Sequence, residues 1–91
     1  MIITKQASAG TNTKNDALVT VFHREGEGID VELHSIVALQ FGRQIIKTAK
    51  EMAAEMGVSS AGIRIEDQGA LDYVIRARVE AAIVRSMEGV K

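Results

Sequence analysis

The sequence predicts an α+β domain in which a small antiparallel or mixed sheet carries two helices on one face, in the order β-β-α-β-α. Apolar and polar residues alternate over residues 29–35 and again over 61–67, which is the period of a strand. Between and after these runs, apolar residues recur every three or four positions, which is the period of a helix. The chain has 91 residues, 46% of them hydrophobic and 25% charged, and this indicates one folded domain.

The first part of the chain is expected to be a polar loop followed by a hairpin. Small, hydroxyl and amide side chains fill residues 8–16, and they cannot bury enough apolar area for a core element. β-Branched and aromatic residues over 18–23 favour a strand, and the alternating run 29–35 favours its hairpin partner. Gly26 and Gly28 lie between the two strands and would allow positive φ in the hairpin loop.

Two helices are expected on either side of a third strand. The first has one apolar stripe, made of Val37, Phe41, Ile45, Ala49, Met52 and Met56, and Gly57 would stop it. Phe41 is expected in the core because it shares this stripe. The strand 61–67 would point Ile63 and Ile65 inward. After Asp67 and Gly69, either of which could cap, a second stripe runs towards Gly89 and comprises Leu71, Ile75, Val79, Ala82 and Ile83.

Composition argues against several classes of protein. Eleven Lys and Arg against twelve Asp and Glu leave a net charge of -1, which provides no field to attract nucleic acid or an anionic membrane. The absence of cysteine excludes disulfides, thiolate catalysis and cysteine-ligated zinc, and it is compatible with a reducing cytosol. No run approaches the roughly 20 apolar residues of a membrane span, and the start lacks a signal peptide's apolar run. We therefore expect a cytoplasmic protein.

No catalytic or metal site is expected from the titratable residues. If residues 18–23 and 29–35 pair as a hairpin, His23 and His34 lie roughly 17 Å apart and cannot share a metal ion. Asp67 and Asp72 stand where the second helix begins, so capping explains them better than a catalytic carboxylate pair. The glycines follow no nucleotide-binding pattern.

Arg76 and Arg78 point away from each other on a helix, so at most one can face the core. The other could bind a phosphate or a partner carboxylate. The remaining basic residues on the two helices, Arg43, Lys47, Lys50 and Arg85, are interspersed with acidic ones and indicate solvated faces. From composition and spacing alone, the chain is a small interaction or carrier module.

Three stretches resemble one family, the acyl carrier (gamma) subunits of citrate lyase. They are residues 9–11 (AGT), residues 31–42 (VELHSIVALQFG) and residues 67–82 (DQGALDYVIRARVEAA), and the resemblance extends over nearly the whole chain. It implies a carrier rather than a catalyst, with residues 1–91 as a single domain and 1–16 as a flexible attachment segment.

The resemblance also implies a cofactor and partners. Such subunits hold a covalent arm, 2′-(5″-phosphoribosyl)-3′-dephospho-CoA, on a serine. A prosthetic-group transferase attaches it, and its thiol carries acetyl and citryl groups between an alpha (transferase) and a beta (lyase) subunit.

This chain departs from the family at the attachment position, because Lys14 stands where the serine is expected. An amine cannot form the phosphodiester. The nearby hydroxyls are those of Thr13, Thr11 and Ser8, and Thr13 is the nearest in register. Two other interpretations stay open: a homologue without the arm that serves as an assembly or regulatory subunit, and the carrier of a malonate decarboxylase type system.

Overall fold

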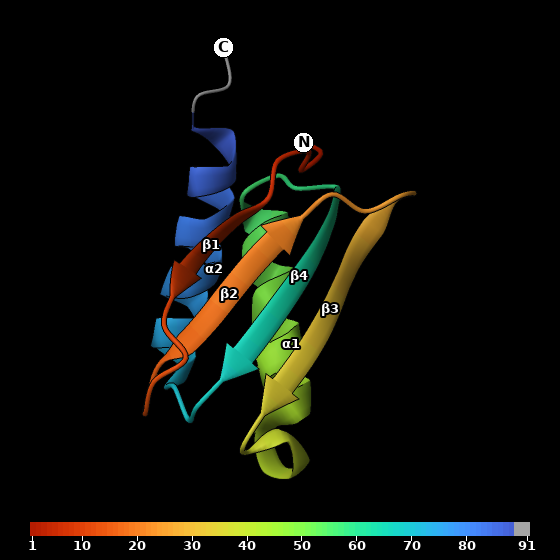
Figure 1. The fold of residues 1–91 in the computed structure, drawn as a ribbon. Coiled ribbons are helices and arrows are strands. Elements are labelled where there is room, and N and C mark those ends of the chain that lie inside the picture. Colours follow the sequence, from red (N-terminus) through yellow and green to blue (C-terminus); the bar gives the residue numbers. More distant parts are fainter. Residues whose placement is uncertain (89–91) are drawn as a thin grey trace.

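A computed structural model describes residues 1–88 and contains one four-stranded sheet with two helices on one of its faces (Figure 1). The elements in chain order are β1 (Ala7–Gly10), β2 (Ala17–Phe22), β3 (Gly28–Ser35), α1 (Ala38–Glu55), β4 (Ser60–Asp67) and α2 (Asp72–Met87). The α+β class, the mixed sheet and the placement of both helices are confirmed. Neither helix is long and apolar enough to cross a membrane within the described part of the chain.

The predicted hairpin between β2 and β3 is wrong, because β4 lies between these two strands. The sheet order is β1-β2-β4-β3, with β4 antiparallel to β2 and parallel to β3. The helix-facing residues of this central strand, such as Ile63 and Ile65, are fully buried, while Arg64 on the other face is exposed. One face of β3 carries Asp30, Glu32 and His34, which suits an edge strand.

The expected loop over residues 8–16 is shorter than predicted, because Ala7–Gly10 form the edge strand β1. This strand pairs antiparallel with β2, and Ala9 lies opposite Val19. Helix α2 covers β1 and β2, so Ala9 is fully buried beneath it. The small side chain of Ala9 allows α2 to pack close to β1. Small side chains also give little apolar signal, which is why the sequence predicted a loop here. The true loop comprises residues 11–16.

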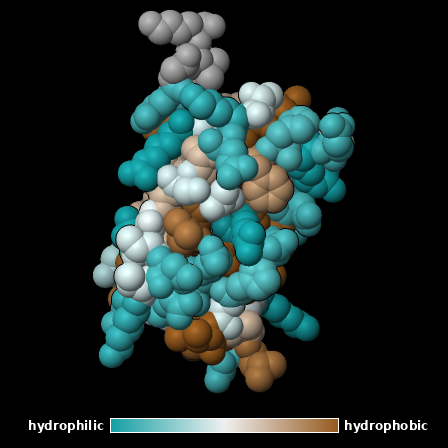
Figure 2. Space-filling model, viewed as in Figure 1, coloured by the Kyte–Doolittle hydropathy of each residue, from teal (hydrophilic) through white to brown (hydrophobic). Residues whose placement is uncertain are grey.

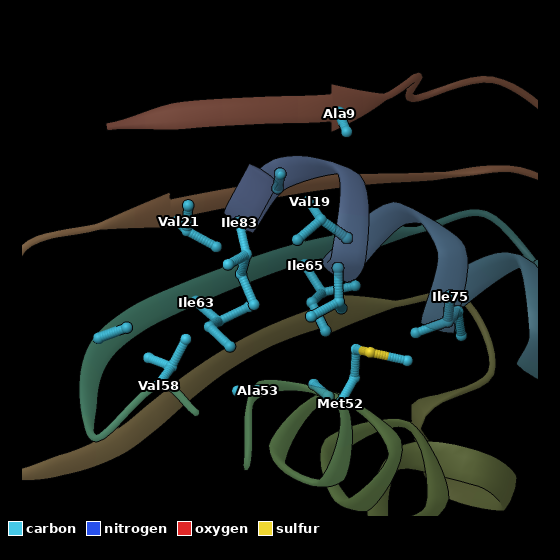
Figure 3. Close-up of a cluster of buried hydrophobic side chains, with 14 of the residues drawn as sticks. Ala9, Val19, Val21, Met52, Ala53, Val58, Ile63, Ile65, Ile75 and Ile83 are labelled. Atoms are coloured by element: carbon cyan, nitrogen blue, oxygen red, sulfur yellow. The ribbon is translucent and has the colours of Figure 1, made fainter. Parts of the chain in front are cut away.

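Apolar side chains from the sheet and both helices meet in one core. Figure 3 shows Ile63 and Ile65 of β4 pointing towards the two helices, as predicted, where Met52 of α1 and Ile75 of α2 lie. The other residues of the two expected stripes that are buried here are Ile45, Ala49, Val79, Ala82 and Ile83. The helical periodicity therefore identified the buried faces correctly over most of both helices.

The predicted burial is wrong near the N-terminal end of each stripe. Phe41 is 56% exposed and Leu71 is 62% exposed, so the prediction that Phe41 belongs to the core is wrong. Figure 1 shows the reason for Phe41: the first turn of α1 extends beyond the ends of the strands, where the sheet no longer covers it. The expected end of the second stripe, Gly89, lies outside the described residues.

Candidate functional site

Three connections between elements meet at one end of the molecule, which we call the loop end. They are the β1–β2 loop (residues 11–16), the β3–α1 connection (36–37) and the β4–α2 connection (68–71). The backbone N–H of Asn15 donates to Gln68 O, and the N–H of Gln68 donates to Asp16 O, both at 2.9 Å. The N–H of Ile36 donates to Asp67 O at 3.3 Å. The three stretches quoted for the family resemblance therefore converge in space.

Arg78 anchors the β1–β2 loop through Asp16. Its Nε donates to Asp16 Oδ1 at 2.9 Å and its Nη2 to Oδ2 at 3.1 Å, a two-point bond between planar groups. The Arg78 side chain crosses Gly10, where a Cβ atom would lie 2.9 Å from Arg78 Cδ and 1.9 Å from the carbonyl oxygen of Ala17. Gly10 also has a φ of +93°, so glycine is the residue that this crossing requires.

Both of the arginines that the sequence offered for a phosphate or a partner carboxylate reach carboxylates of their own chain. Arg78 binds Asp16, and Arg76 Nη2 lies 3.1 Å from Glu55 Oε2 on α1. The second pair is more open to solvent than the first. Arg78 therefore has a structural role at the loop, which spacing along the helix did not indicate.

A chain of hydroxyl groups leads from the loop to Asp16. Thr11 Oγ1 donates to Asp16 Oδ2 at 2.7 Å, and the Oγ1 atoms of Thr11 and Thr13 lie 2.7 Å apart. Because Thr11 has a single hydroxyl proton, Thr13 must be the donor in the second bond. Arg78 first, then Thr11 and the N–H of Ala17, hold the pKa of Asp16 well below its usual range. The chain of hydroxyls therefore ends on a carboxylate that is charged at neutral pH.

Of the candidate attachment residues, Thr13 and Lys14 lie in the β1–β2 loop and Ser8 lies in strand β1. Thr13, Lys14 and Asn15 are exposed in a turn that the N–H of Asp16 closes by donating to Thr13 O at 3.1 Å. Lys14 makes no hydrogen bond or ion pair within residues 1–88. Ser8 lies in β1, where its Oγ bonds to Thr20 Oγ1 at 3.0 Å. Thr11 and Thr13 are thus the two exposed hydroxyls of the loop, and Thr13 is the one that does not bond directly to Asp16.

Asp67 and Asp72 do not cap α2 as predicted. The N-cap is Leu71, and no side chain bonds to the helix start. Asp67 is fully buried and accepts from Ser35 Oγ at 2.7 Å and from the N–H of Ala70 at 2.8 Å, which ties the β3–α1 and β4–α2 connections together. Asp72 lies in the first helical turn and accepts from Thr48 Oγ1 at 2.5 Å, which links α2 to α1.

His23 directly follows β2 and His34 lies in β3, and the two have separate partners. His23 Nδ1 is 3.2 Å from Ile3 O, and His34 Nε2 is 2.9 Å from Glu32 Oε2. The bond from His34 and the nearby Arg64 guanidinium lower the pKa of Glu32. Residues 1–88 hold no group of three or more His, Asp or Glu side chains that could bind a metal ion.

Five large apolar side chains are exposed at the loop end, and we call them the apolar patch. Its side chains are between 56% and 100% exposed, and they are Ile36, Leu39, Phe41, Leu71 and Tyr73. Figure 2 shows hydrophobic groups gathered at the lower end of the molecule, where α1 begins in Figure 1. Beside it, a groove of about 360 Å³ runs between α1 and the start of α2, with Phe41, Ile45 and Ile75 among its walls. Sequence periodicity had assigned Phe41 and Leu71 to the core, so this surface was missed.

Comparison with known proteins identifies close relatives along the whole chain. The family model described as "Malonate decarboxylase delta subunit (MdcD)" matches residues 4–86. A protein of Escherichia fergusonii is 44% identical over 88 residues, covering 97% of this chain and 91% of its own length. Relatives from Clostridium perfringens (46% identical, 97% and 87% covered) and Halothermothrix orenii (44%, 98% and 94%) are equally similar. All three bear the name "Citrate lyase acyl carrier protein". No solved structure matches the chain.

Proposed function

This chain belongs to the citrate lyase acyl carrier family, and we propose that it carries acetyl and citryl groups between the alpha and beta subunits of a citrate lyase complex in the cytoplasm. The observation that carries the proposal is full-length similarity to named carriers, at 44% to 46% identity. The anchored, exposed loop adds support, because a carrier needs a fixed base from which an arm extends. The description of the family model that matches residues 4–86 supports the malonate decarboxylase interpretation, but the named relatives at 44% to 46% identity are citrate lyase carriers and favour the first interpretation. No observation favours the assembly-subunit interpretation.

The arm proposed for this chain is 2′-(5″-phosphoribosyl)-3′-dephospho-CoA, and its thiol would hold the acyl group as a thioester. A phosphodiester bond needs an oxygen nucleophile on the protein. Lys14 ends in an amine and offers no oxygen, so the residue at the family's serine position does not fit the arm. If this chain carries the arm, the attachment residue is one of the neighbouring hydroxyls.

We propose Thr13 as the attachment residue. Its side chain is exposed on the loop, and among the nearby hydroxyls it is the nearest in register to the position where the family has serine. Thr11 is less suitable because it lies further in register from the family's serine position, and Ser8 is less suitable because it is paired with Thr20 within the sheet. Asp16 orients the hydroxyls rather than acting as a strong base, because its pKa is held low.

The mobility that a swinging arm needs is proposed for residues 11–15 alone. Residues 7–10 are paired with β2, and Asp16 is bound to Arg78, so both ends of the loop are fixed. A short tether on a fixed base keeps the acyl group at a high effective concentration near both catalytic subunits.

Intact mass spectrometry of the chain produced together with the prosthetic-group transferase tests this proposal. We compare the native chain, Thr13→Ala, Lys14→Ser and, as the matched hydroxyl control, Ser8→Ala. The native chain and Ser8→Ala are expected to gain the mass of the arm, and Thr13→Ala is expected to stay unmodified. An authentic carrier in the same cells shows that the transferase is active.

Two other results would change the interpretation. If the native chain stays unmodified and Lys14→Ser gains the arm, the attachment position is residue 14 and the natural chain has no arm. It would then act as an assembly or regulatory subunit. If neither protein is modified while the authentic carrier is, the acyl carrier proposal fails for this chain.

A further inference from the structure

We propose that the groove between α1 and the start of α2 binds the pantetheine part of the arm when the arm folds back onto its own chain. The presence of the arm rests on the proposed function. The size, the chemistry and the position of the groove come from the chain itself.

The groove has the size and the walls of a small-molecule site. Its volume of about 360 Å³ lies within the range of roughly 300–1,000 Å³ that such sites occupy. Phe41 of α1 and Leu71, the residue before α2, both line it and are more than half exposed, and the buried Ile45 and Ile75 also line it. Contact with these walls removes apolar carbon from water. The dimethyl carbon and the methylene groups of pantetheine supply such carbon.

Two polar side chains of the groove offer hydrogen-bond acceptors. Thr48 Oγ1 donates its only proton to Asp72 Oδ1 at 2.5 Å, so the Gln44 atom that lies 3.3 Å from Thr48 must be a donor, the nitrogen Nε2. Gln44 Oε1 and Asp72 Oδ2 then accept no hydrogen bond within residues 1–88, and both side chains line the groove. The amide N–H groups of pantetheine are donors that fit these acceptors.

The nucleotide part of the arm fits the groove less well. Its adenosine carries phosphate on both sides, on the diphosphate and on the phosphoribosyl group, and these charges would lie near the Asp72 carboxylate. Pantetheine carries phosphate at one end only, and its thiol end is neutral. The groove therefore favours the end of the arm that holds the acyl group.

The groove lies next to the loop that is proposed to carry the arm. Gly69 lines the groove, and a Cβ atom on it would lie 3.8 Å from Asn15 Oδ1 of the loop. Thr13 precedes Asn15 by two residues, which is at most about 7 Å of chain. The arm contains ribose, nucleotide and pantetheine units in series and is longer than this. A tethered pantetheine therefore reaches the groove at high effective concentration, and even weak contacts hold it there.

The test is a titration of the isotope-labelled chain, produced without the transferase and so without an arm, followed by two-dimensional NMR. The probe is free S-acetyl pantetheine, and adenosine is the control ligand. Phe41→Ala removes an exposed wall of the groove, and Gln44→Leu removes an acceptor. Leu39→Ala is the matched control, because it removes an exposed side chain of the same helix that does not line the groove. Thermal melting checks that all variants fold.

We expect millimolar S-acetyl pantetheine to shift the amide signals of groove residues such as Ala70 and Ile75. Phe41→Ala and Gln44→Leu should bind it on the order of fivefold more weakly, and Leu39→Ala should bind it as the native chain does. A chain that carries the acetylated arm should show the same shifts without added ligand.

Three results would overturn the inference. If S-acetyl pantetheine shifts no groove amide, the groove does not bind this part of the arm, while the mass measurement still decides the proposed function. If adenosine shifts the same amides as strongly, the groove does not select the pantetheine part. If the probe binds but the chain never gains an arm beside an active transferase, the arm is not the occupant of the groove, and the proposed function fails together with the inference.

Discussion

The centre of the molecule and its loop end are stabilised by different kinds of residue. In the centre, apolar side chains such as Ile65 and Val79 are fully buried between the sheet and the helices. At the loop end, polar bonds from Arg78 and Ser35 hold the connections, while large apolar side chains face outward. Apolar residues therefore stabilise the fold in one region and are available to a ligand in the other.

This difference shows what hydrophobic periodicity can and cannot indicate. The stripe of α1 has the same spacing from Val37 to Met56, but its buried members begin at Ile45. Spacing identifies the face of a helix, and only the extent of the sheet decides how much of that face is covered. A stripe that continues past its own sheet is a signal for a binding surface.

The largest effect is expected in the centre. Ile65→Ala removes a fully buried side chain from the middle of the sheet and should lower the free energy of unfolding by about 2–5 kcal/mol. Urea denaturation measures this. A loss below about 1 kcal/mol would mean that the centre is packed too loosely to differ from the loop end.

A smaller loss is expected where the loop leaves β1. Gly10→Ala forces a left-handed residue to carry a Cβ that meets backbone and Arg78, so we expect a loss of about 1–3 kcal/mol. Hydrogen exchange should show the amides of residues 11–16 opening faster, with the centre unchanged. Faster exchange throughout the sheet would show that the loop end and the centre unfold together.

The two arginine pairs allow a matched comparison. Arg78→Met keeps the aliphatic stem over Gly10 but removes the bond to Asp16, so it should accelerate exchange in the loop. Arg76→Met removes an exposed pair with Glu55 and should cost at most about 1 kcal/mol. It should leave the loop amides unaffected. Equal effects on the loop would show that Arg78 is not its anchor.

The bond from Arg78 to Asp16 also predicts a pH dependence. Because the folded pKa of Asp16 is lowered, the pair stabilises the protein fully above the unfolded pKa of about 3.9. This stabilisation is lost as the pH falls from there through the folded pKa. The native chain should therefore be more stable than Arg78→Met by a constant amount above about pH 5, and the difference should shrink below about pH 4. Urea unfolding across this range measures it, and a difference that grows in acid would contradict the assignment.

The smallest stability effect is expected in the apolar patch. Phe41→Ala should cost less than about 1 kcal/mol, since most of its ring is already in water and a buried phenylalanine would cost about 3–5 kcal/mol. The same urea measurement distinguishes these values. A loss in the higher range would place Phe41 in the core and remove it from the exposed wall of the groove.

Local pattern was sufficient to predict most elements and the fold class, because strand and helix periods are properties of short segments. The pairing of β2 with β3 was predicted wrongly, because proximity in sequence favours a hairpin and nothing local indicates that β4 will insert between them. The strand β1 was missed because Ala7 and Ala9 are too small to produce an apolar signal. Ala9 is buried only because α2 packs on β1, and α2 lies far away in the sequence.

The candidate site was predictable only as separate parts. The stretches that contain Gly10 and Arg78 were both singled out by family resemblance, as was the change to Lys14. The contact between Arg78 and Asp16 spans 62 positions, and no spacing rule for a helix or strand connects such residues. The contact is a tertiary property, and it explains why these two stretches depend on each other.

The insertion of β4 between β2 and β3 limits how far the sheet can fold during synthesis on the ribosome. Synthesis runs from the N-terminus, so β2 and β3 are made before the strand that must separate them. The sheet cannot close until residue 67 has emerged, and the loop cannot be anchored until Arg78 follows it. An enzyme that recognised the anchored loop would therefore act only after residue 78 has been made and can reach Asp16.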